Sequence, residues 1–281
     1  MIVVNEQVLS DVNKNFIIPP KPQILNELEI LASAQEPSLS DAAEIIAKDV
    51  AISSAILKII NSPSYGLVRS VSDIKQAIMF LGWNGIEALV PSLKLKQMFT
   101  QKECCISLER FWDTATEIAE VNMIVGQCIK EKVPIEYLYT LGLFHDCGIV
   151  PMAIKFDNYV SALHTSNNTH RESLIDIEER LYGTNHATVG YYLASSWHLP
   201  IDICQLILRH HDMSMLNNIT GSNQQLCYCV LKMSENLVNS VLRGDTTKDW
   251  DDIEKQVLAT LNMSEDDYID VQEEVIDFLN C

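Results

Sequence analysis

Glycine and proline are scarce in this chain, and no stretch alternates apolar with polar residues. Ten glycines and nine prolines occur among 281 residues, and they are spread along the chain. Half-buried strands alternate apolar and polar residues, and sheet proteins need frequent turn residues. With 47% hydrophobic residues the chain can still bury a large core. These features argue against a sheet protein and against a disordered chain, and they predict an all-α fold.

Runs of positive charge are also missing. The chain has 38 acidic and 20 basic residues, which gives a formal net charge of −18. Proteins that bind nucleic acids gain affinity by placing a basic face against phosphates. We therefore expect no nucleic-acid partner. Glycine-rich phosphate loops and nucleophile motifs are absent as well.

Signals for export or membrane insertion are not found. The longest uncharged run, from Leu181 to Ile201, contains Gly, Asn, His, Ser and Pro residues that make it unsuitable as a membrane span. The first sixteen residues lack the basic start and apolar centre of a signal peptide. The eight cysteines form no CxxC pair. We expect a cytoplasmic protein with reduced cysteines and no membrane contact.

Apolar residues recur at the spacing of three and four that marks one face of a helix. We expect helices over residues 22–35, 86–98, 109–130, 173–182, 186–197, 201–211 and 224–243, and shorter ones capped by Ser40, Asp49 and Ser72. Gly82 is expected to end one of these in a left-handed conformation. Ser264 and Asp267 predict a capping box for a last acidic helix. The polar residues 161–171 are expected to form a surface connection.

No linker rich in Gly, Ser or Pro divides the chain, so we expect its helical lobes to pack as one unit. We predict an N-terminal arm (residues 1–15) and one domain (16–245) made of two packed lobes (16–100 and 101–245). Acidic C-terminal helices (246–281) follow. The sequence leaves open whether these last helices pack on the body or protrude.

One histidine-aspartate pair and three later histidines are the candidate ligands. His145 and Asp146 come near the end of a strongly apolar segment, and His186, His210 and His211 fall on two further expected helices. Imidazole and carboxylate groups together can bind iron, manganese or zinc, with open positions for a phosphate or a water molecule. If the five side chains do not converge, they are polar residues satisfied by neighbouring groups.

The order of these residues resembles the HD superfamily of metal-dependent phosphohydrolases, whose helical bundle collects a first His, an HD pair, later His residues and a final Asp. Four upstream blocks are similar to those of the HDOD family, the HD-related output domain: Ile18–Pro22, Ile45–Asp49, Lys58–Gly66 and Ser72–Gly82. This resemblance covers roughly residues 16 to 240 and implies that the second lobe is HD-like. It also implies a bacterial signalling protein. Members of the HDOD family are mostly thought not to be enzymes.

The resemblance also implies a degenerate metal site. The first His of the HD pattern aligns with Thr114, and a hydroxyl is a poor ligand for a transition metal. Asp113 could replace it only if the helix were rotated by about 100°. Glu235 stands where the final Asp belongs, and the later histidine pair is not followed by Gly-Tyr-Pro.

Three functions remain open. The leading hypothesis is a regulatory module that binds a signalling partner protein or a small ligand, without a cofactor and without catalysis. The alternative is a phosphohydrolase whose metal is held by five residues, with Glu235 as a sixth candidate ligand: His145, Asp146, His186, His210 and His211. The third is a scaffold without a ligand pocket.

Two geometric expectations separate these functions. The phosphohydrolase requires the imidazoles of His145 and His186 and the carboxylate of Asp146 to lie within a few ångströms of one point. The binding module requires a pocket or an exposed apolar patch at the junction of the lobes. A scaffold would have neither feature.

Overall fold

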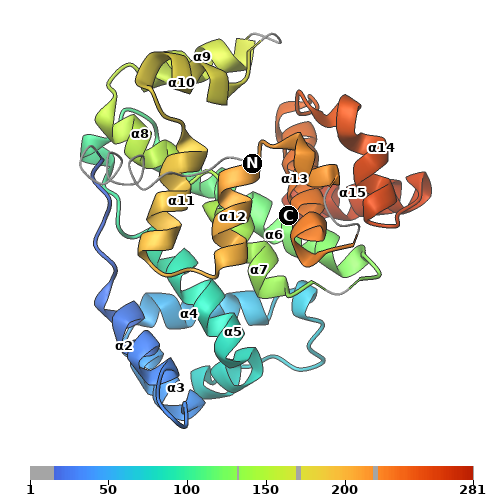
Figure 1. Ribbon diagram of the computed structural model, residues 1–281. Coiled ribbons are helices and arrows are strands. Elements are labelled where there is room, and N and C mark those ends of the chain that lie inside the picture. Colours follow the sequence, from blue (N-terminus) through green and yellow to red (C-terminus); the bar gives the residue numbers. More distant parts are fainter. Residues whose placement is uncertain (1–15, 132, 169–171, 218–220, 281) are drawn as a thin grey trace.

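The computed structural model describes residues 16–131, 133–168, 172–217 and 221–280, and these residues form helices and no strand (Figure 1). The all-α prediction is confirmed. The predicted arm at residues 1–15 lies outside the described residues. Among the helices described, none combines the length and the apolar character that crossing a membrane requires.

The first lobe lies at the bottom of Figure 1 and contains α2 (Gln23–Ala32), α3 (Leu39–Ala47), α4 (Val50–Ile60) and α5 (Ile74–Leu95). Side-chain oxygens cap three of these helices, each contributing about 1 kcal/mol. Asp49 is the cap that the sequence predicts. Ser38 and Asp73 take the places predicted for Ser40 and Ser72.

A kink divides α5 at Gly82, which has φ 66° and ψ −176°. The positive φ was predicted and favours a residue without a Cβ atom, but a ψ of −176° lies outside the left-handed helical region that was expected. The predicted break between two helices is instead a sharp bend, because the chain becomes helical again directly after Gly82. The second half of α5 thereby turns toward the other lobe, where Gly85 faces the Glu136 side chain of α7.

The second lobe is built on α6 (Leu108–Cys128) and α7 (Ile135–Phe144), which pack along each other. A Cβ atom at Gly142 would lie 2.5 Å from Cα of Ala119, so this glycine permits the close approach. The remaining helices of the lobe are α8 (Ile149–Lys155), α9 (Tyr159–Asn168), α10 (Leu174–Tyr182), α11 (His186–Ser196), α12 (Ile201–Arg209) and α13 (Asn223–Arg243). The helix α9 occupies most of the segment that was predicted to be a surface connection.

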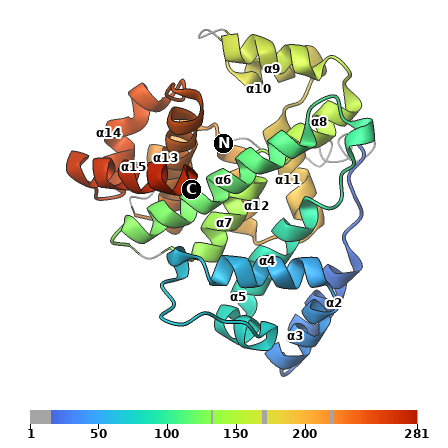
Figure 2. The same cartoon turned by 180° about the vertical axis from the view of Figure 1, so that it is seen from behind.

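The C-terminal helices pack on the body rather than protrude. Both α14 (Trp250–Thr260) and α15 (Glu265–Leu279) lie against α13, and α15 also contacts α6 (Figures 1 and 2). Trp250 stacks on Tyr268, and the Tyr268 hydroxyl accepts a hydrogen bond from Asn236 at 3.2 Å. Their acidic residues face solvent while Val257, Val271 and Val275 are buried, so the charge promotes solubility without preventing packing.

Direct contacts join the two lobes. The α5 helix packs on α7, and the Trp197 indole nitrogen donates a hydrogen bond to the Pro19 carbonyl at 3.0 Å. On the other side, Lys58 pairs with Glu120 at 3.2 Å. One continuous hydrophobic core extends through both lobes. The lobes therefore pack as one unit, as predicted.

Candidate metal centre

The five candidate side chains all lie at helix ends. His145 and Asp146 directly follow α7, His186 is the first residue of α11, and His210 and His211 directly follow α12. The start of α11 is fixed by Asn185, whose side chain accepts a hydrogen bond from the Thr188 amide at 2.8 Å. Helix ends are rigid supports, so the ligand positions are set by the packing of three helices.

Close contact at Gly148 brings two of these ends together. A Cβ atom on Gly148 would lie 1.9 Å from the His186 carbonyl oxygen and 2.6 Å from the Gly190 nitrogen. The turn after His145-Asp146 therefore rests directly on the first turn of α11. Cys147, between the aspartate and the glycine, is fully buried against Gly190. This contact places Asp146 beside His186.

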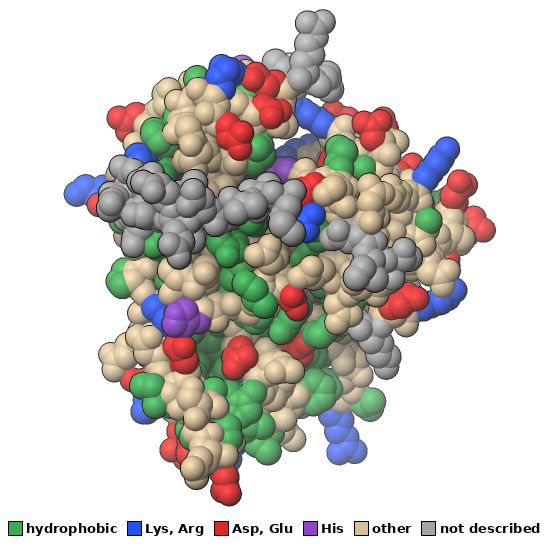
Figure 3. All heavy atoms as spheres, in the orientation of Figure 1, with side chains coloured by type: hydrophobic (Ala, Val, Ile, Leu, Met, Phe, Trp, Pro, Cys, Tyr) green, Lys and Arg blue, Asp and Glu red, His purple; other side chains and the backbone are tan. Residues whose placement is uncertain are grey.

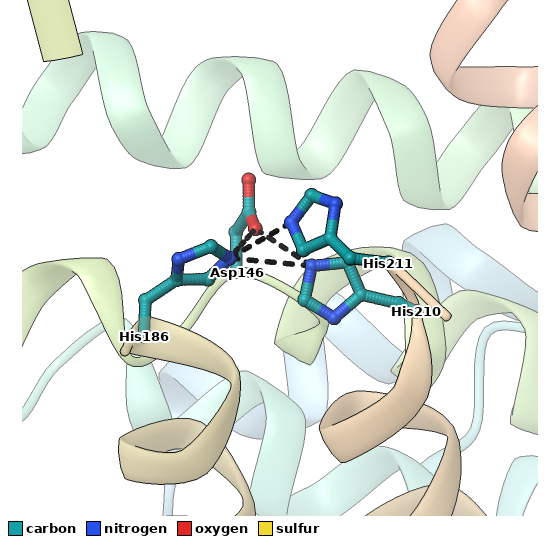
Figure 4. Close-up of side chains that lie close together, drawn as sticks. All are labelled: Asp146, His186, His210 and His211. Carbon is teal, nitrogen blue, oxygen red and sulfur yellow. Dashed lines mark hydrogen bonds and ion pairs between the residues drawn. The ribbon is translucent and has the colours of Figure 1, made fainter. Parts of the chain in front are cut away.

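Four side chains offer donor atoms to one point (Figure 4). One ligand atom from each of Asp146, His186, His210 and His211 lies within 4.8 Å of every other. The Nε2 atoms of His186 and His210 are each 3.3 Å from Asp146 Oδ1, and His186 Nε2 is 3.0 Å from His211 Nε2. The sequence left open whether the candidate side chains converge, and the donor atoms of these four do.

The tautomers of the buried imidazoles leave Nε2 available. Nδ1 of His145 donates to the Gly142 carbonyl and Nδ1 of His210 to the Ile207 carbonyl, both at 2.7 Å. Nδ1 of His186 donates to Glu178 at 2.7 Å. A neutral imidazole with its proton on Nδ1 presents a lone pair at Nε2. Nitrogen lone pairs and a carboxylate thus face one another, an arrangement that a proton or a metal cation would stabilise.

Glu178 contacts the four-donor group and was not among the residues predicted from the sequence. Its side chain is fully buried, and it accepts hydrogen bonds from the backbone and Nδ1 of His186 and from the Tyr159 hydroxyl. Carboxylates in this position orient a metal-binding histidine and increase its basicity. The sequence does carry a signal for it. Glu178 is one helical turn from both Leu174 and Tyr182, so it is an acidic residue on the apolar side of α10.

His145 and Glu235 lie on the other side of Asp146. The Nε2 atom of His145 is 3.5 Å from Asp146 Oδ2 and 3.5 Å from Glu235 Oε1. Burial alone would lower the pKa of His145, but Asp146 and Glu235 outweigh it and raise that pKa. The structure therefore separates the predicted set into a four-donor group and a neighbouring pair.

The pKa values of the four-donor group are strongly shifted. Burial would raise the pKa of Asp146, but His145 and the hydrogen bonds from His186 and His210 hold it well below its usual value. Burial would lower the pKa of His186, yet Glu178 and Asp146 raise it to about 10. The surrounding protein and the neighbouring imidazoles lower the pKa values of His210 and His211. Among the three imidazoles of the four-donor group, His186 is therefore the one whose protonated form is favoured.

The position expected for the first histidine contributes nothing to the four-donor group. Thr114 is half-buried on α6, and Asp113 is exposed and does not belong to the group of His, Cys, Asp and Glu side chains that converge among the described residues. Three imidazole nitrogens and one carboxylate oxygen still suit a divalent transition metal such as iron, manganese or zinc. The donor set fits one such ion without a ligand from α6.

Comparison with known proteins places this geometry in a family. The sequence model of the HDOD domain matches residues 18–213. An uncharacterized protein of Treponema pallidum (strain Nichols) is 23% identical over 196 residues, which cover 70% of this chain and 38% of that protein. The chain thus spans well under half the length of this relative.

Two solved structures share the fold. A candidate phosphohydrolase from Shewanella amazonensis SB2B has a TM-score of 0.65 at 18% identity, covering 96% of this chain and 93% of that one. A candidate signal transduction protein from Marinobacter aquaeolei VT8 has a TM-score of 0.67 at 14% identity, covering 97% of this chain and 62% of that one. The family match includes all four donors of the centre, whereas Glu235 lies beyond it. The chain belongs to the HDOD domain family.

Proposed function

We propose that this chain is a signalling module that acts by binding a partner, and that its HD centre has kept one metal-binding half and lost the other. The observation that supports the metal site is the convergence of three Nε2 atoms and Asp146 Oδ1. The retained half is His186, His210, His211 and one oxygen of Asp146. We keep residues 16–245 as the proposed extent of the domain.

The remaining half argues against a dinuclear catalytic site. His145, Glu235 and the second oxygen of Asp146 face one another, but α6 adds no donor there. Dinuclear catalytic sites hold two ions that together stabilise the attacking and the leaving oxygens, and this half offers fewer donors than the other. We therefore assign the centre a structural or regulatory role.

The metal assignment is tested by elemental analysis of protein purified without chelator or affinity-column metal. His210→Ala removes a donor from the four-donor group, and His145→Ala is the matched control because it removes a buried imidazole outside that group. We expect stoichiometric metal in the unmodified protein and in His145→Ala, and a strong loss in His210→Ala. Equal metal loss in both variants would contradict the division of the site.

A groove at the junction of the lobes supports the binding role. It has a volume of about 340 Å³ and lies between α2 and α5, with Tyr137 and Trp197 of the second lobe in its wall. In Figure 3, hydrophobic side chains interspersed with acidic ones lie on the surface between the first lobe, at the bottom, and the second lobe above it. Residues of both lobes line the groove, which supports the hypothesis of a binding site at the junction of the lobes.

The chemistry of the groove favours a basic side chain of a partner protein. Trp83 and Glu87 are one helical turn apart on α5, and both line the groove. Glu87 is exposed and has no ion pair among the described residues, while Glu29 is already paired with Lys21 and His198. An aromatic face beside a free carboxylate attracts Arg and Lys side chains.

Titration calorimetry with a short arginine-rich peptide tests this site. Glu87→Lys should weaken binding much more than Glu44→Lys, which makes the same charge change at an exposed position of α3 outside the groove. If the two variants lose the same affinity, the attraction is general and the groove is not the binding site.

A phosphohydrolase remains a second candidate because the four-donor group is open to solvent. Asp146 is 31% exposed and His211 is exposed, so a phosphate ester can approach. A bound divalent metal would polarise a phosphoryl oxygen and acidify water. Hydrolysis of 4-nitrophenyl phosphate by the metal-loaded protein, abolished in His210→Ala, would favour this function over binding alone.

A further inference from the structure

A buried lysine lies next to the incomplete half of the centre. Lys232 is in the middle of α13, and its side chain is 4% exposed. Its ammonium group is 3.0 Å from Glu235 Oε2 and 3.1 Å from Asp249 Oδ2. Removing an ammonium group from water is costly unless it is paired with carboxylates. The two acids satisfy this requirement.

One of the two acids that bind Lys232 also contacts the centre. Glu235 presents one oxygen to Lys232 and the other to His145 Nε2 at 3.5 Å. His145 Nε2 is in turn 3.5 Å from Asp146 Oδ2, while Asp146 Oδ1 faces His186 and His210. One oxygen of Asp146 thus belongs to each half. A bridging carboxylate with imidazoles on one side and an imidazole and a second carboxylate on the other is a donor pattern that suits two cations.

The charges of the second half require a cation. Glu235 and Asp249 both contact the Lys232 ammonium group, and Glu235 and Asp146 both lie 3.5 Å from His145 Nε2. An ammonium group supplies the positive charge of a cation but cannot share donors, because it offers hydrogens rather than empty coordination positions. Its positive charge therefore neutralises Glu235 and weakens the attraction of that carboxylate for a metal ion.

We propose that the Lys232 ammonium group takes the place of the second metal ion and limits the HD centre to one metal. This inference rests on the proposed function, which places the one metal at His186, His210, His211 and Asp146. The lysine is held by Asp249, which directly precedes α14, so the C-terminal helices beyond the family match fix its position. Burial alone would lower the pKa of Lys232, but Glu235 and Asp249 outweigh it and keep the side chain charged.

A purely structural lysine would make the same salt bridges, so the test measures how many metal ions each chain binds. The proteins are dialysed against Mn²⁺, and bound manganese is measured by elemental analysis. Lys232→Met removes the charge at similar length, Lys232→Gln keeps a polar group, and Lys232→Arg is the control that keeps the charge. Electron paramagnetic resonance distinguishes an isolated Mn²⁺ ion from a spin-coupled pair.

We expect one Mn²⁺ per chain in the unmodified protein and in Lys232→Arg, and two with a spin-coupled signal in Lys232→Met or Lys232→Gln. Two ions in the unmodified protein would overturn the inference without any variant, even if the variants fail to fold. One ion in folded Lys232→Met and Lys232→Gln would overturn it as well and leave the single-metal site intact. No ion in any of the proteins would refute the proposed metal site itself.

Discussion

Replacing Gly148 with alanine is expected to damage both stability and metal binding. The added Cβ atom would lie 1.9 Å from the His186 carbonyl oxygen, which is backbone and cannot rotate away. Reaching an ordinary contact requires α11 to move by about 1.5 Å relative to the His145-Asp146 turn. Gly148 itself has φ −69° and ψ −18°, so alanine meets no backbone strain there, and the whole effect comes from this contact.

The expected cost is that of an overpacked core, roughly 1–3 kcal/mol of unfolding free energy or more. For a chain of this size the melting temperature should fall by roughly 2–4 °C per kcal/mol. Because His186 moves with α11, metal affinity should fall by roughly tenfold or more, since such sites tolerate displacements of only about 0.5 Å.

Gly126→Ala is a matched control for Gly148→Ala. Its Cβ atom would lie 2.2 Å from Cδ1 of Leu138, but this atom is the tip of a flexible side chain. Leu138 lies near the start of α7, at the end away from His145. Thermal unfolding and metal titration of both variants make the comparison. If Gly148→Ala is as stable as Gly126→Ala and binds metal normally, the contact between the turn and α11 does not set the ligand geometry.

Three further predictions concern the four-donor group. Glu178→Gln should weaken metal binding by roughly 10–100-fold because His186 loses its carboxylate partner, and titration calorimetry would show an unchanged affinity if Glu178 is only structural. Metal affinity should rise about tenfold per pH unit between pH 7 and 9, because the pKa of His186 is raised to about 10 and its proton must leave before Nε2 can bind; a flat profile would mean that no proton is displaced. A chelator should lower the melting temperature by roughly 5–10 °C if the metal is present at about 100 times its dissociation constant, and no shift would contradict a metal in the folded state.

Sequence patterns predicted most helices because their signals are local. The cap at Asp49 and the capping box of Ser264 with Asp267 depend on residues three positions apart, and the structure shows both. The segment that forms α9 was missed because only Tyr159, Ala162 and Ser166 are buried there, too weak an apolar stripe to mark a helix. Short polar helices of this kind are stabilised by packing rather than by propensity.

The candidate ligands were also visible in the sequence, since His and Asp side chains in a recognisable order indicate the chemistry directly. Their division into two groups was not, because it depends on which oxygen of Asp146 faces which imidazole. Glu178 and Lys232 were missed for a related reason: on their own helices each is one charged residue, and only tertiary packing brings them to His186 and Glu235.

X-ray absorption spectroscopy of the metal-loaded protein tests the single-metal centre most directly, because the outer-shell scattering of imidazole rings counts the histidine ligands. With His186, His210, His211 and Asp146 as the donors, the spectrum should require three imidazoles and at least one oxygen ligand per metal. Its fit should not change in Glu235→Gln. A spectrum with one imidazole per metal, or one altered by Glu235→Gln, would show that the ion lies on the other side of Asp146 and would contradict the proposed site.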